Sequence, residues 1–147
     1  MLEEPIRLEL HNIGHFAPFH IFWNDAGVAK AASDKFCRFM GLTDLHKLQE
    51  SLWVLEPFVA PFNRRLFSDI TNLILHVGIR SNTKQVLKGE LIKIDSGWMF
   101  SGLPPARSIA ELTDYGLQLS DLPLHLGIGD FLLANEAAQV SMAESAR

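Results

Sequence analysis

The chain has 147 residues, close to the usual size of one domain and enough to bury an apolar core without disulfides or metal. Hydrophobic residues make up 48% and charged residues 20%, a balance that excludes a disordered chain and is typical of a folded globular protein. The net charge of -4 and the scattered basic residues exclude a phosphate-tracking basic surface, so no nucleic-acid partner is expected.

The first predicted element is a β-hairpin. Residues 16–24 are aromatic and β-favouring, and residues 28–33 return with small side chains after a turn at 25–27. Three short helices are predicted next: the first follows a cap at Ser33 or Asp34, the second follows Thr43 and Asp44, and the third lies within residues 62–72. Between the second and third helices, residues 53–55 are expected to form a short extended piece, followed by a loop bracketed by two prolines.

The next forty residues change to the period of two that marks strands. Apolar side chains alternate along residues 73–79 and again along 85–94, and a second turn leads into a strand at 98–102. Strands joined by tight turns are expected to be antiparallel neighbours. Together with the first hairpin they predict an α+β fold, in which a five-stranded antiparallel sheet carries short helices on one face.

A turn between two predicted helices follows the last strand. A capping box at Ser108 starts the first helix and Gly116 stops it. Because Pro123 keeps the residue before it out of helical geometry, residues 119–125 are predicted to form an extended corner. Asp130 is then expected to cap a C-terminal exit helix.

This segment carries a family resemblance. The run from Gly116 to His125, followed by Asp130, resembles the signature of the haem-NO-binding-associated domain, the PAS-like module beside the haem domain in soluble guanylate cyclases and bacterial histidine kinases. Further motifs follow in the family's order, and several loosely spaced motifs are more specific than any one. The motif residues, interpreted as a structural joint and its supports, are Pro18, Phe19, His20, Gly89, Gly102, Pro104, Gly116, Leu117, Asp121, Pro123, His125 and Asp130.

The resemblance implies a PAS-like fold and a non-catalytic role in dimerisation and in relaying a signal to the C-terminal helix, without haem or another cofactor in this domain. The implied parent is a multidomain signal-transduction protein with a histidine kinase, nucleotide cyclase or diguanylate cyclase output beyond Arg147. A homodimer is the implied form, with a haem-NO-binding domain or protein as upstream partner. The chain departs from the family's pattern at Glu56, where arginine is common, and at Leu126 and Gly129, where Asp and Arg are usual.

The predicted organisation has three parts: an N-terminal extension at 1–15, a PAS-like domain at 16–129 and a signalling helix at 130–147. In that helix, Leu133, Ala137 and Val140 have the spacing of a coiled-coil seam and are candidates for a dimer contact. A helix that packs back on its own sheet fits its first turns equally well.

The histidines and Asp121 are the remaining candidates for chemistry. His11, His15 and His20 invite a metal hypothesis, but no Cys, Asp or Glu completes a close ligand set, so no metal site is predicted. His125 is interpreted as bonded to a backbone carbonyl rather than as a ligand or a pH switch. Asp121 is interpreted as a turn-maker rather than a catalytic acid, and no catalytic group remains.

An alternative function is a PAS-type sensor that binds a small molecule or cofactor in an internal pocket. Aromatic residues at this spacing are more often simply core, and that interpretation is favoured. The aromatic residues that would line the pocket are Phe19, Phe22, Trp23, Phe36, Phe39, Trp98 and Phe100.

A cytoplasmic location is expected. The first five residues are acidic where a signal peptide is basic, and no apolar run reaches the roughly 18 residues that span a bilayer. Cys37 is the single cysteine, and a chain without an internal disulfide agrees with a reducing compartment. Its side chain is interpreted as a buried, inert thiol.

Overall fold

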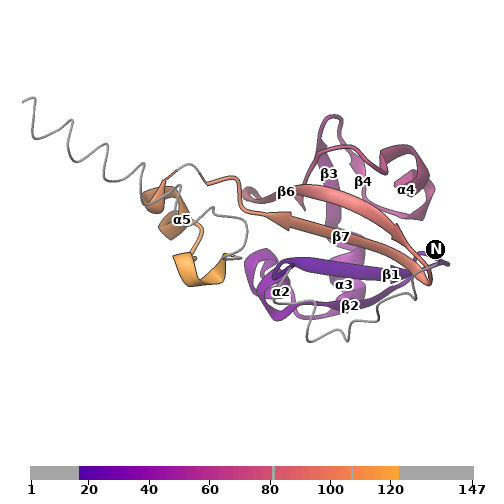
Figure 1. The fold of residues 1–147 in the computed structure, drawn as a ribbon, viewed down its shortest axis with the longest axis horizontal. Coiled ribbons are helices and arrows are strands. Elements are labelled where there is room, and N and C mark those ends of the chain that lie inside the picture. The colour runs from indigo at the N-terminus through magenta and orange to yellow at the C-terminus, as the bar shows by residue number, and fades with distance from the viewer. Residues whose placement is uncertain (1–16, 81, 107, 123–147) are drawn as a thin grey trace, which may run out of the picture.

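One curled antiparallel sheet dominates the fold (Figure 1). The structure, a computed structural model, describes residues 17–80, 82–106 and 108–122. Seven strands in these ranges pair in the order β2-β1-β7-β6-β5-β3-β4. Their bounds are β1 His20–Asn24, β2 Ala29–Ala32, β3 Leu52–Glu56, β4 Ala60–Pro61, β5 Leu75–Ile79, β6 Asn82–Ile94 and β7 Gly97–Leu103.

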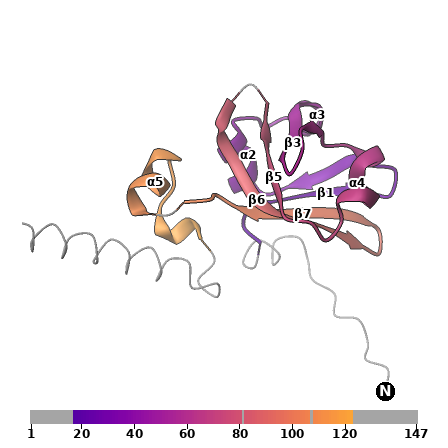
Figure 2. The ribbon, with the colours of Figure 1, turned by 90° about the horizontal axis from the view of Figure 1, so that it is seen from above.

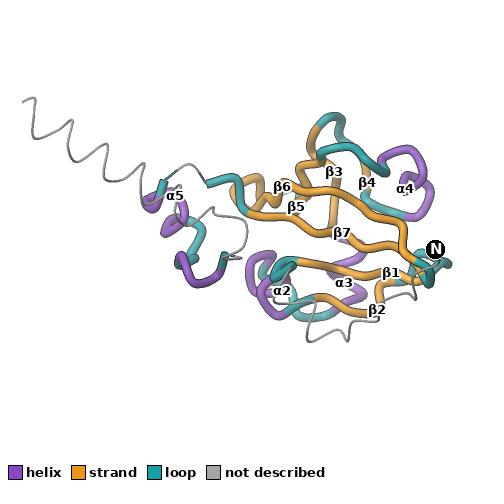
Figure 3. The backbone as a smooth tube through the Cα atoms, viewed as in Figure 1, coloured by secondary structure: helices purple, strands orange, loops and turns teal. Residues whose placement is uncertain are grey.

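Four α-helices and a 3-10 turn accompany the sheet in the described ranges (Figure 3). Helices α2, α3 and α4 add buried side chains to the same core as the strands, so they cover one face of the sheet. In contrast, α5 and η1 lie beyond the end of β7, away from that face (Figure 2). The bounds are α2 Asp34–Met40, α3 Leu45–Ser51, α4 Arg64–Ile70, α5 Ile109–Asp114 and η1 Leu119–Asp121.

The first three helices start where local chemistry predicts. Side-chain oxygens of Ser33, Asp44 and Asn63 accept amide N–H groups of the first helical turn. The backbone N–H groups of Lys47 and His46 lower the pKa of Asp44, because they bond its charged form. This cap is therefore present at neutral pH and is lost as the pH falls through the lowered pKa.

The α+β class is confirmed, and so are both predicted strand groups. The predicted hairpin is β1–β2, the predicted three-stranded group is β5–β6–β7, and all five strands are consecutive in the sheet. The predicted count of five strands is wrong, because β3 and β4 extend the sheet past β5. Val54 pairs with Val77 on one side and with Ala60 on the other. Pro61 is tolerated there because β4 is an edge strand.

Aromatic side chains fill the centre of the fold. Trp23 stacks on Phe62 with ring centroids 5.1 Å apart and contacts Phe67 edge-on at 5.0 Å. Phe62 in turn meets the edge of Phe100 at 5.7 Å. Ring pairs at these separations add stabilisation beyond the area they bury. The predicted aromatic set is therefore mostly core, except that Phe22 lies half-buried on the opposite face of the sheet.

Cys37 is half-buried on α2 rather than fully buried as predicted, and it packs against the main core. Burial raises the pKa of its thiol, and the nearby carboxylate of Asp34 raises it further. Both effects favour the protonated thiol over the reactive thiolate, which agrees with an inert cysteine.

Candidate functional site

The segment of residues 108–122, here called the joint, leaves the sheet through α5 and η1. Its helix begins as predicted: the Ser108 hydroxyl oxygen accepts the N–H of Glu111 at 3.1 Å. Leu112, one turn into the helix, is 1% exposed. The cap thus fixes the start of α5 so that its apolar side faces the rest of the joint.

The end of α5 is a Schellman motif, in which a residue with positive φ reverses the chain. Gly116 has a φ of 75° and donates its N–H to the Thr113 carbonyl at 2.8 Å. Leu117 donates its N–H to the Leu112 carbonyl at 3.1 Å, and the two leucine side chains belong to the same cluster. Glycine suits this position because a side chain there would be strained. The predicted stop at Gly116 is confirmed.

The predicted extended corner is wrong at residues 119–121, which form the 3-10 turn η1. Asp121 accepts the N–H of Gln118 through Oδ2 at 2.9 Å, and its own N–H donates to the Gln118 carbonyl at 2.9 Å. The restriction imposed by Pro123 acts only on the residue before it, so it leaves this turn free to form. Asp121 is the turn-maker that the sequence predicts.

The joint has a small core of its own. Leu112 and Leu122 are 1% and 5% exposed and form a cluster separate from the main core. Leu103 at the end of β7 and Leu117 are partly buried and pack against both clusters. These two leucines therefore link the joint to the sheet.

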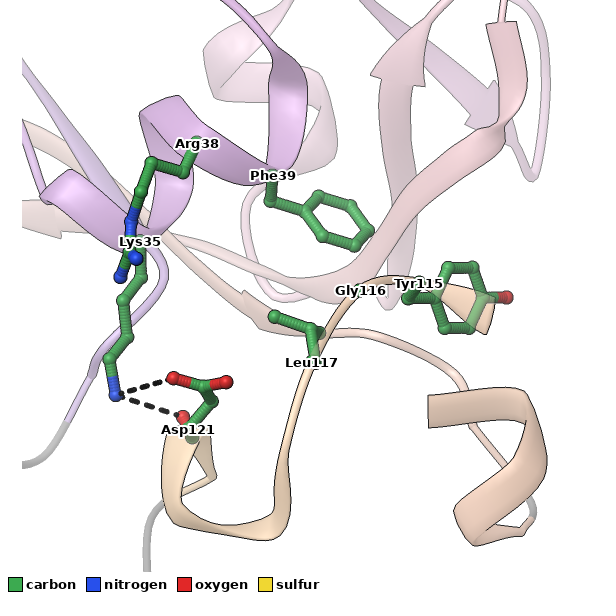
Figure 4. A pocket seen from close by; sticks show the side chains of 7 residues that line it. All are labelled: Lys35, Arg38, Phe39, Tyr115, Gly116, Leu117 and Asp121. Atoms are coloured by element: carbon green, nitrogen blue, oxygen red, sulfur yellow. Dashed lines mark hydrogen bonds and ion pairs between the residues drawn. The ribbon is translucent and has the colours of Figure 1, made fainter. Parts of the chain in front are cut away.

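Helix α2 provides the other described connections. Tyr115 lies against Phe39 with ring centroids 5.9 Å apart, and Lys35 pairs with the Asp121 carboxylate at 3.4 Å (Figure 4). The Lys35 ammonium also donates to the Asp121 carbonyl at 3.4 Å. Sequence reasoning missed Lys35, because no local pattern signals a pairing across 86 residues.

Hydrogen bonds of the Ser33 side chain hold the motif at residues 18–20 in place, and these four residues are here called the Ser33 node. The Ser33 hydroxyl donates to the Pro18 carbonyl at 2.5 Å and accepts the N–H of His20 at 3.1 Å, in addition to capping α2. His20 is 4% exposed, and its Nδ1 donates to the Ala17 carbonyl at 2.6 Å. His20 is thus a hydrogen-bonded core histidine, and Phe19 beside it is fully buried.

The motif glycines Gly89 and Gly102 face each other across β6 and β7. A Cβ on Gly89 would clash with the Ser101 carbonyl oxygen and lie 2.5 Å from the Gly102 Cα, so the close approach of the strands requires glycine. Gly102 also donates its N–H to the Phe19 carbonyl at 3.1 Å, which joins two motifs distant in sequence. Pro104 is buried directly after β7.

Several predicted site residues lie outside the described residues, and the statements about them stay predictions. So do the domain boundaries at 15 and 130 and the exit helix. The residues concerned are His11, His15, Pro123, His125, Asp130, Leu133, Ala137 and Val140.

Neither a group of metal ligands nor a membrane-spanning helix is present among the described residues. In residues 17–80, 82–106 and 108–122 no three His, Cys, Asp or Glu side chains are grouped as a metal site would require. Within the same ranges, no helix has the length and apolar character needed to cross a membrane.

The sheet and the joint define a small α+β domain with an appended helical segment. A family model described as "Heme NO binding associated" matches residues 32–147, well over half of the chain. The chain therefore belongs to the haem-NO-binding-associated family, a non-catalytic domain family linked to haem-NO-binding signalling proteins. The matched region contains the joint and the two motif glycines, whereas residues 18–20 precede it. A search of curated proteins found no match.

Proposed function

We propose that this domain is a non-catalytic dimerisation and signal-relay module in which the joint transmits changes in the sheet to the chain that follows. The observation that carries the proposal is the separate core of the joint, which meets the body of the domain through Leu103, Leu117 and the contacts with α2. A segment with a small core and few connections opens at lower free energy than the body. Such a segment is suited to two discrete positions.

The family membership supports the setting of this proposal. The upstream partner is a haem-NO-binding domain or protein, and the output is a histidine kinase, nucleotide cyclase or diguanylate cyclase in the same cytoplasmic protein. The five predicted strands are neighbours in the order β2-β1-β7-β6-β5, which supports a PAS-like sheet. Strands β3 and β4 are an addition at one edge of that sheet. The alternative of an internal-pocket sensor receives less support, because rings that would line the pocket are in contact with other core rings. Phe19 contacts Phe39, and Trp98 contacts Phe67.

The outer face of the sheet is the surface that we propose for dimerisation. Phe22, Met99 and Ile92 are direct neighbours across β1, β7 and β6, on the face opposite the helices. Ile92 is 38% exposed although it is apolar. A second copy that covers this row would bury apolar surface on both subunits.

Light scattering of the 147-residue chain over a concentration series tests the proposal. We expect a dimer at about 50 µM, with a mass that falls on dilution. Ile92→Glu should shift the chain to monomer, because it places a charge in the apolar row. Val28→Glu is the matched control, since Val28 is 44% exposed on the β1–β2 connection. A wild-type monomer throughout the series would contradict dimerisation.

A further inference from the structure

A cavity of about 160 Å³ lies between α2 and the joint (Figure 4). Its walls combine charged and apolar groups from both parts of the molecule. Within the described ranges the lining residues are Lys35, Arg38, Phe39, Tyr115, Gly116, Leu117 and Asp121. Two of them, Lys35 and Arg38, are three residues apart on α2 and therefore share a helix face.

The charges of the described lining residues do not balance. Among the lining residues that the structure describes, Lys35 and Arg38 bring two cations and Asp121 brings one carboxylate. Asp121 pairs with Lys35 at 3.4 Å, and within the described ranges Arg38 has no hydrogen-bond or ionic partner for its side chain. A guanidinium in this position favours a carboxylate, which it can bind through two parallel hydrogen bonds.

The size and the apolar walls narrow the choice of ligand. An engineered cavity of about 150 Å³ in another protein takes one benzene molecule, so this cavity has room for a single ring or a short alkyl chain. Phe39 is 5% exposed, and the Phe39 and Leu117 side chains supply apolar contact. The cavity therefore offers a charged end and an apolar end within one small volume.

We propose that this cavity binds a small monocarboxylate that carries one ring or a short apolar chain. Arg38 is the charge partner of its carboxylate, and Phe39 and Leu117 contact its apolar part. The bound carboxylate also competes with Asp121 for Lys35, which weakens the connection between α2 and the joint. The ligand thereby regulates the relay, and this regulatory step rests on the function proposed above.

Benzoate is the probe for the test, and benzamide is its uncharged counterpart. Amide chemical shifts of the full 147-residue chain, recorded at constant ionic strength, should report benzoate binding at the Gly116 and Leu117 amides. We expect a dissociation constant on the order of 1 mM for benzoate. Benzamide should bind about tenfold more weakly or not at all, because it lacks the charge that Arg38 recognises.

Matched variants assign the binding to the cavity. Arg38→Gln should weaken benzoate binding about fivefold, whereas Arg65→Gln on α4, also an exposed arginine, should leave it unchanged. Asp121→Asn should strengthen binding, because Lys35 loses its competing carboxylate. A well-dispersed spectrum of each variant shows that it folds. Lys35→Gln, which should also weaken binding, provides a second test of the same site.

The outcomes separate the two proposals. Absence of benzoate shifts up to roughly 20 mM, equal binding of benzamide, or unchanged binding by Arg38→Gln would each overturn the site. If the site is overturned while light scattering shows a dimer, the proposed function stands. If benzoate binds as described to a chain that stays monomeric, the site stands and its place in a dimeric relay is overturned.

Discussion

The main core and the small core of the joint differ in what surrounds their buried side chains. In the main core, Trp23, Phe62 and Phe67 contact one another, and each is at most 1% exposed. In the joint, two leucines are buried and their neighbours are only partly buried. A core that buries little apolar area is stabilised less, so it opens at a lower free energy. We therefore expect the joint to lose its packing while the sheet stays folded.

The largest expected effect is in the main core. Phe62→Ala should lower the free energy of unfolding by about 3–5 kcal/mol, because it removes a ring that is 1% exposed and leaves a cavity beside Trp23. Urea denaturation followed by fluorescence measures the loss. Phe58→Ala is the control: Phe58 is 41% exposed, so its loss should stay within about 0.5 kcal/mol. Similar losses for the two variants would contradict the central role of the aromatic core.

A smaller and more local effect is expected from Leu112→Ala. The substitution removes half of the buried pair in the joint and should destabilise that segment by about 2 kcal/mol. Hydrogen exchange should show faster exchange at the amides of Leu112, Gly116 and Leu117, while the amides of β6 and β7 keep their protection. Equal loss of protection in the sheet would show that the joint and the sheet unfold as one unit.

Two glycines with the same backbone conformation allow a direct test of the comparison. Gly41 and Gly116 both have a φ of 75° at the end of a helix, and a Cβ added to either has open space around it. Alanine at either position should cost about 1 kcal/mol of local strain. We expect Gly41→Ala to lower the free energy of global unfolding and Gly116→Ala to increase hydrogen exchange in the joint alone. Identical exchange patterns would contradict a separate joint.

The smallest expected effect concerns the ion pair between α2 and the joint. The Lys35 and Asp121 side chains are 32% and 23% exposed, so Asp121→Asn should destabilise the joint by about 0.5 kcal/mol. Exchange of the Leu117 amide, which bonds the Leu112 carbonyl rather than Asp121, measures it. The difference from wild type should shrink at about 1 M salt because the pair is screened. Asp69→Asn on α4, which removes another acidic side chain, should leave that exchange rate unchanged.

Features set by neighbouring residues could be predicted from the sequence. Ser108 caps α5 and Gly116 ends it because both act on the backbone within one helical turn. The β1–β2 hairpin and the β5–β6–β7 group follow from alternating side chains and short turns. In each case the chemistry that decides the structure lies within a few residues.

Features set by distant residues were decided only by the tertiary structure. The pairing of β4 with β3 was hidden by the prolines around their connection and by the two-residue length of β4. Likewise, the Ser33 node and the Lys35–Asp121 pair join residues that are 15 and 86 positions apart. The sequence by itself thus determined the local starts, stops and turns of this protein. The tertiary structure decided the pairing of edge strand β4 and the attachment of the joint. Folding brings together groups whose spacing along the chain carries no local signal.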